Sequence, residues 1–169
     1  MVAVEVWERG DSLSGLLRAL LPADLRGNVR LYPAGRMGEQ SRPDLAVVSP
    51  YWRGEASGAC RCLLVPGTMG PTAGKMRAGW VVSYGLDRRD TLTLSAMEPG
   101  RLCAALQREL VTPDGTTVEG QELPLSNGWE LPPMAALACV GAQLLLGVPP
   151  EGVRLEARGS LAPGEGFVV

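Results

Sequence analysis

The chain contains no histidine and a single lysine, Lys75, among its 169 residues. Without histidine it cannot build a Ser-His-Asp or Cys-His catalytic arrangement, nor any zinc site that requires an imidazole ligand. The other basic residues are arginines, which stay protonated in proteins and therefore cannot act as general bases. These absences exclude several of the commonest hydrolytic and metal-dependent chemistries.

Basic clusters are also missing, because 16 basic residues face 18 acidic ones and the net charge is −2. The pair Arg88 and Arg89 is flanked by Asp87 and Asp90. Nucleic-acid binding requires a basic surface that displaces counterions, so we expect no nucleic-acid partner. The longest apolar run, residues 134–148, is too short to cross a bilayer, so we expect no membrane insertion.

The first residues show no basic stretch followed by an apolar one, which predicts that the chain carries no secretory signal. We therefore expect a cytoplasmic location, where thiols stay reduced. Of the four cysteines, Cys103 and Cys139 lie in apolar runs typical of a core. Cys60 and Cys62 form a C-x-C pattern, but a structural zinc site usually needs two such pairs. We predict no metal site, and buried or idle thiols instead.

Aromatic residues are scarce, at 5%, so leucine, valine and alanine must fill the core. The length fits one domain over residues 1–169. The 22 glycines and 14 prolines predict many turns and short elements. The polar, glycine-rich residues 33–43 are expected to form a mobile loop.

The hydrophobic pattern predicts an α/β fold: a small parallel sheet with flanking helices plus an antiparallel β-meander. Unbroken apolar runs, typical of strands buried on both faces of a parallel sheet, occupy residues 44–49, 61–65 and 80–84. The other predicted elements are strands over 2–7 and 28–32, helices over 13–21 and 132–146, the meander over 91–125 with one long strand at 102–112, and an edge strand within 153–169.

A glycine-rich segment, GTMGPTAGKM over residues 67–76, follows a predicted strand and is similar to a phosphate-binding loop. Its spacing departs from that of a Walker loop, which has four residues between its glycines and a Ser or Thr after the lysine. Three residues separate Gly70 from Gly74, and Met76 replaces the hydroxyl residue. A plain surface loop and a ligand site both remain open, with candidate residues Gly67, Thr68, Gly70, Gly74, Lys75 and Asn127.

Two aromatic segments lie among turn residues and are poorly explained as core. They contain Tyr51 and Trp52, and Trp129 and Leu131, with Gly128 and two prolines close to the second. Aromatic residues in such settings often anchor interfaces, so we predict contact with a protein partner or a second copy of the chain. Packing in the core or at its rim is the alternative interpretation.

Five segments resemble, in serial order, parts of one enzyme family. They are PDLAVV at 43–48, VVSYGL at 81–86, RELVTPDGTTVEGQELPL at 108–125, AALACVGAQLLLGVPPEGV at 135–153, and PGEG at 163–166. The order resembles the second half of the central domain of Mur ligases, ATP-dependent enzymes that join amino acids to a UDP-linked muramic acid precursor. The resemblance implies a fold of the same kind.

The departures from that family concern its catalytic parts. Nothing before Pro43 resembles its phosphate loop, and the segment 51–59 has no lysine where the family has a lysine-bearing helix. Ser126 and Asn127 stand where the family has His-Asn, and its third domain is expected to be missing. The resemblance therefore implies a reduced relative without catalysis or cofactor.

Three hypotheses of function follow. The first is a non-catalytic binding or protein-interaction domain with a Mur-ligase-like core. The second is a small nucleotide- or UDP-sugar-binding module, or an enzyme, that uses the loop 67–75. The third is a structural homo-oligomer.

Overall fold

The computed structural model describes residues 1–34, 42–69 and 75–157. Most of the loop expected at 33–43 lies outside these ranges, as does most of the tail in which an edge strand was predicted. Residues 153–157, which the structure does describe, form no strand.

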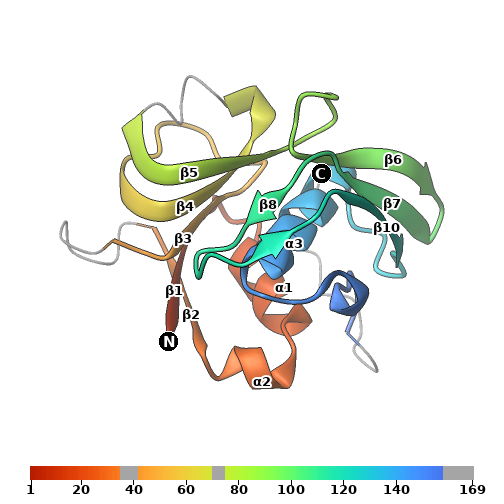
Figure 1. The fold of residues 1–169 in the computed structure, drawn as a ribbon, viewed down its shortest axis with the longest axis horizontal. Coiled ribbons are helices and arrows are strands. Elements are labelled where there is room, and N and C mark those ends of the chain that lie inside the picture. Colours follow the sequence, from red (N-terminus) through yellow and green to blue (C-terminus); the bar gives the residue numbers. More distant parts are fainter. Residues whose placement is uncertain (35–41, 70–74, 158–169) are drawn as a thin grey trace.

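In the described chain, two helices follow the first strand, and strands then predominate up to one long helix near the end (Figure 1). In chain order the elements are β1 Val2–Trp7, α1 Leu13–Leu20, α2 Ala23–Arg26, β2 Val29–Pro33, β3 Leu45–Val48, β4 Gly58–Pro66, η1 Gly67–Met69, β5 Met76–Tyr84, β6 Leu92–Glu98, β7 Arg101–Leu106, β8 Leu110–Val111, β9 Thr117–Val118, β10 Gln121–Ser126, α3 Pro133–Leu145 and η3 Pro150–Gly152.

One large sheet organises the molecule, with the strand order β10-β7-β6-β5-β4-β3-β1-β2. Strands β1 to β6 are parallel to their neighbours, whereas β7 pairs antiparallel with both β6 and β10. The predicted α/β class is therefore confirmed, including the parallel pairing of the three apolar runs; the run at 80–84 is not buried on both faces, because Val81 is 56% exposed. The predicted meander continues the same sheet, so β7 is the reversed strand between two strands of the common direction.

The long strand predicted over 102–112 is wrong, because β7 ends at Leu106 and β8 begins at Leu110. The amide of Gln107 still donates to the carbonyl of Thr91, next to the last pair of the ladder, Leu92 and Leu106. The chain then leaves the large sheet and forms the small β8–β9 hairpin. Trp80 holds this hairpin against β5 through a 2.9 Å bond from Nε1 to the carbonyl of Val111.

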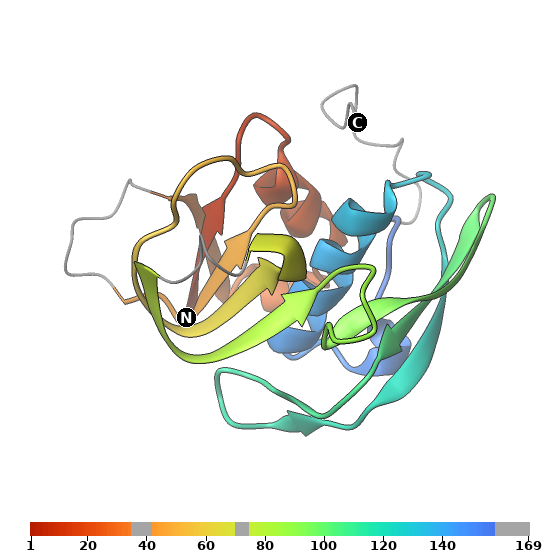
Figure 2. The same cartoon turned by 90° about the horizontal axis from the view of Figure 1, so that it is seen from above.

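Helix α3 lies at the centre of the main core, beside α1 and against one face of the sheet (Figure 2). All of its residues from Ala135 to Leu145 are buried. The predicted helix over 132–146 is thereby confirmed, with Ala136, Leu137, Val140, Leu144 and Leu145 in the core. The buried side chain of Gln143 bonds both the amide and the carbonyl of Arg154, which ties the segment after η3 to the helix.

The opposite face of the sheet carries a smaller core, in which Ala46, Val48, Leu63 and Val65 are buried. In the ranges that the structure describes, loop residues rather than a helix cover this face. Trp52 is one of them, and its ring meets that of Trp7 edge-on at a centroid distance of 5.5 Å.

Three of the four thiols are buried, and Cys60 and Cys62 belong to different hydrophobic clusters. Burial raises the pKa of Cys60 to about 11 and that of Cys62 to about 12. Within the described ranges, no group of three or more His, Cys, Asp and Glu residues is placed to hold a metal ion. None of the described helices is long and apolar enough to cross a membrane.

We predict that Leu144→Ala lowers the free energy of unfolding by about 2–5 kcal/mol, because the side chain is fully buried and its removal leaves a cavity. The matched control is Leu86→Ala, since Leu86 is 64% exposed. Its effect should stay below about 0.5 kcal/mol. Urea unfolding of both variants measures this, and equal effects would show that α3 is not packed as described.

The cysteines predict a selective labelling pattern. Cys103 is partly exposed, whereas Cys60, Cys62 and Cys139 are buried and burial raises the pKa of each of their thiols. Because the thiolate is the reactive form, iodoacetamide at pH 8 should modify Cys103 and leave the other three until the chain unfolds. Peptide mass spectrometry locates the label. Early modification of Cys62 would contradict the described core.

Candidate functional site

A cleft of about 920 Å³ opens at the edge of the sheet where the parallel strands β3, β4 and β5 end. Its lining comes from four segments: Pro50 and Tyr51 after β3, Gly67 and Thr68 after β4, Leu86, Asp87, Arg89 and Asp90 after β5, and residues 132–134 at the start of α3. In open α/β sheets, ligands bind beyond the carboxyl ends of the strands. The position of this cleft makes it the candidate functional site.

Asp90 is the most enclosed charged group of the cleft, with only 6% of its surface exposed. Its Oδ2 accepts a 3.1 Å bond from the amide of Asp87, and its own amide bonds the carbonyl of Asp87. A Cβ atom at Gly67 would lie 1.9 Å from Oδ1, and one at Gly85 would lie 2.5 Å from Oδ2. The glycines that end β4 and β5 are therefore required by the packing of one carboxylate.

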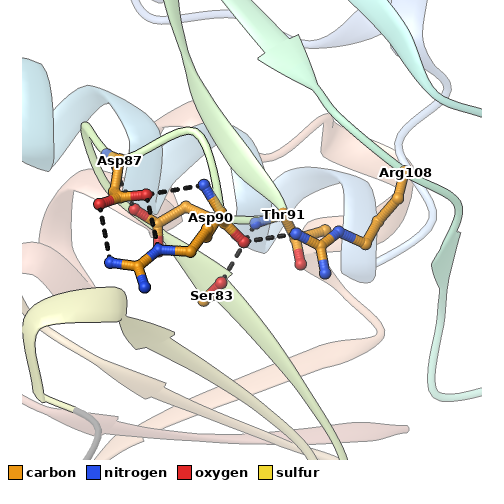
Figure 3. Close-up of polar contacts among 6 residues, drawn as sticks. Ser83, Asp87, Asp90, Thr91 and Arg108 are labelled. Atoms are coloured by element: carbon orange, nitrogen blue, oxygen red, sulfur yellow. Dashed lines mark hydrogen bonds and ion pairs between the residues drawn. The ribbon is translucent and has the colours of Figure 1, made fainter.

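The other two charges of the cleft lining, Asp87 and Arg89, pair with each other (Figure 3), whereas Arg88 of the same turn is exposed and lies outside the lining. Both carboxylate oxygens of Asp87 accept bonds from Arg89, at 3.2 Å each, on the exposed side. Arg108 donates to the carbonyl of Arg89, and Ser83 accepts from the amide of Thr91 at 3.1 Å, which attaches the turn to β5. In the described ranges, Oδ1 of Asp90 receives no hydrogen bond and meets no cation.

Tyr51 is held on the cleft wall by a chain of bonds from a buried carboxylate. Ser49 Oγ donates to Asp11 at 2.5 Å and accepts from the amide of Tyr51 at 3.1 Å. Burial, with a smaller contribution from Asp11, raises the pKa of Tyr51. The phenol therefore keeps its proton at neutral pH and offers a hydrogen bond rather than a base.

The structure separates the residues of the predicted ligand site. Gly67 and Thr68 line the cleft, whereas Lys75 forms an exposed 2.9 Å ion pair with Glu55 and is not part of the lining. Gly70 and Gly74 lie outside the described residues. Asn127 is 1% exposed, and its side chain bonds the amide and carbonyl of Leu131, so it positions the segment that leads into α3.

The structure places the predicted interface residues in different environments. Tyr51 lines the cleft, Trp52 packs in the smaller core, and the partly buried Trp129 packs against the main core. Leu131 is 2% exposed, so its side chain belongs to the main core and not to a surface, because the bonds from Asn127 turn it inward. Contact with a protein partner or a second copy stays a prediction.

Sequence reasoning missed Asp90 and the start of α3 as parts of one site. The polar turn directly after the buried strand at 80–84 was a usable signal, because that strand's carboxyl end had to lie at the sheet edge. Nothing local to residues 132–134 indicates that they reach the same edge. Their contribution depends on how α3 crosses the sheet.

We predict that Gly67→Ala costs about 1–3 kcal/mol of stability, because the new methyl group collides with Oδ1 of Asp90. The control Gly27→Ala meets no atom within 4 Å and should leave stability unchanged or raise it by up to about 1 kcal/mol.

The same substitution in an Asp90→Ala background should cost much less, since the colliding oxygens are gone. Thermal and urea unfolding of the four proteins completes the cycle. An identical cost in both backgrounds would show that Asp90 is not the group that excludes a side chain from position 67.

Comparisons with known proteins identify neither a family nor a curated relative, because no family model and no curated protein matches the chain. The similar solved structures include two crystal structures of MurF from Acinetobacter baumannii, with 14% identity each and TM-scores of 0.47 and 0.43. Another is UDP-N-acetylmuramoylalanyl-D-glutamyl-2,6-diaminopimelate–D-alanyl-D-alanyl ligase from the same organism, with 17% identity and a TM-score of 0.45. Each alignment covers 94% of this chain and 46% of the other, so the chain spans about half the length of these structures.

Proposed function

We propose that this chain is a non-catalytic binding domain whose ligand occupies the cleft at the carboxyl ends of β3, β4 and β5. The observation that carries the proposal is the cleft itself, about 920 Å³ in volume, with prolines, Leu86 and Met134 in its walls and the enclosed carboxylate of Asp90. Ligand sites are typically concave, mostly apolar and fitted with a few placed polar groups. This cleft has that composition.

The state of the reactive groups supports binding without catalysis. Asp87 is engaged on both oxygens by Arg89, and the pKa of Tyr51 is raised, so neither is poised to accept a proton. The thiols of Cys60 and Cys62 have raised pKa values and are buried, which makes them inert as nucleophiles.

A ligand with phosphate groups fits the cleft poorly. Its anionic oxygens would meet the carboxylate of Asp90, and like charges at short range repel strongly in a partly desolvated site. To compensate, Arg89 would have to leave Asp87, or Lys75 would have to leave Glu55. We therefore favour a ligand without phosphate over the nucleotide and UDP-sugar alternatives.

Chemical-shift mapping tests the proposal. A ¹⁵N-labelled chain is titrated with a fragment library of cationic, neutral and anionic compounds that includes Mg-ATP. We expect at least one chemical series to shift the amides of Gly67, Thr68, Leu86 and Met134 together, and Mg-ATP to shift none of them. Binders that map elsewhere, or a library without a single binder at this cleft, would refute the proposal.

A matched pair of variants separates specific binding from surface adhesion. Leu86→Ser removes an exposed apolar group from the cleft wall, whereas Met97→Ser removes one from β6, away from the cleft. Both side chains are exposed, so folding should be unaffected. The first variant should weaken cleft binding and the second should not.

A further inference from the structure

The carboxylate of Asp90 is largely enclosed, and one of its two oxygens has no hydrogen-bond donor in the described ranges. The side chain is 6% exposed, and Oδ2 is occupied by the amide of Asp87. Oδ1 lies against Gly67, a residue of the cleft lining, and has no donor in the described ranges of the chain. Among the described residues, the buried side-chain atoms without a partner are Tyr32 Oη and Trp52 Nε1, so Oδ1 of Asp90 keeps access to solvent and a donor that enters the cleft can reach it.

In the described ranges, no ion pair neutralises Asp90. Asp87 and Arg89 neutralise each other in an exposed ion pair on the outer side of the turn. The net charge of the cleft lining is therefore the single negative charge of Asp90. The apolar walls beside it, formed by Leu86, Met134 and prolines, suit a chain of methylene groups and not a second charge.

We infer that the cleft binds a cationic nitrogen, an ammonium or guanidinium group on an aliphatic stem, which donates to Oδ1 of Asp90 while the stem lies on Leu86 and Met134. The inference rests on the proposed binding function and names its ligand class. The same chemistry is presented by the arginine or lysine side chain of a polypeptide and by a free alkylamine.

The structural role of Asp90 does not by itself explain its charge. Oδ2 closes the turn by accepting from the amide of Asp87, and the side-chain carbonyl of asparagine can accept that bond equally well. Asp90→Asn therefore keeps an acceptor of the same shape and removes the charge that a cation needs. The control Asp24→Asn removes one charge from an exposed residue of α2, outside the cleft.

The test uses two pairs of probes that differ in charge and little in shape. N-acetyl-arginine methylamide is compared with its citrulline counterpart, and hexylamine with 1-hexanol. Dissociation constants come from the backbone amide shifts of the ¹⁵N-labelled full chain, with the shifts mapped onto residues 67, 86 and 134. In at least one pair, we expect the charged member to bind about tenfold or more tightly than the neutral one, the preference that a charge-assisted hydrogen bond supports.

Asp90→Asn should abolish this preference, and Asp24→Asn should retain it. Preference in the arginine pair alone indicates a polypeptide side chain as the source, and preference in the hexylamine pair alone indicates a free amine; either result supports the inference. Because the comparison of charged with neutral probes is made in the wild-type chain, it does not depend on how well any variant folds.

Equal affinity within both pairs would overturn the inference, as would a preference that survives in Asp90→Asn or shifts that map away from the cleft. Failure of this idea can be told from failure of the binding function. If neutral or anionic compounds occupy the cleft while cations do not, the domain binds ligands but Asp90 does not bind a cation. If nothing occupies the cleft, both proposals fail.

Discussion

The burial of α3 beside α1 and against the sheet is the constraint on which the rest of the structure depends. Nearly every side chain of this helix is enclosed, so it can occupy only one position and one rotation against the strands. That position brings its first residues to the carboxyl edge of the sheet, beside the turn that follows β5. The cleft is thus a by-product of core packing, and its shape is as rigid as the core.

The carboxylate of Asp90 is the second organising feature, because it restricts which residues can follow two different strands. It needs glycine at the end of β4 and again at the end of β5, because both of its oxygens occupy the space of a Cβ atom. It also closes its own turn by bonding Asp87. Cation binding, as proposed above, would give the charge of this side chain a role beyond packing.

The two faces of the sheet are closed in different ways. Helices α1 and α3 cover one face, whereas loop residues and the edge-on pair Trp7 and Trp52 close the other over β3 and β4. Because large aromatic rings bury much area from a short segment, a loop can cover a sheet face that usually requires a helix. Trp52 therefore has a packing role in this chain, whatever else it contacts.

Much of the fold was decided by local pattern. Apolar runs at 44–49, 61–65 and 80–84 indicated the parallel strands. The apolar run between two proline pairs indicated α3, because a helix that is buried on all sides has no polar face.

The site was decided by tertiary structure. Residues 67, 86–90 and 132–134 are distant in the chain and meet only because parallel strands end at one edge and α3 starts there. Local pattern also failed between β7 and β8, where the chain leaves the large sheet to form the β8–β9 hairpin. It left Gly67 open between a plain surface loop and a ligand site, because the carboxylate that requires this glycine follows another strand and no spacing within the loop indicates that contact.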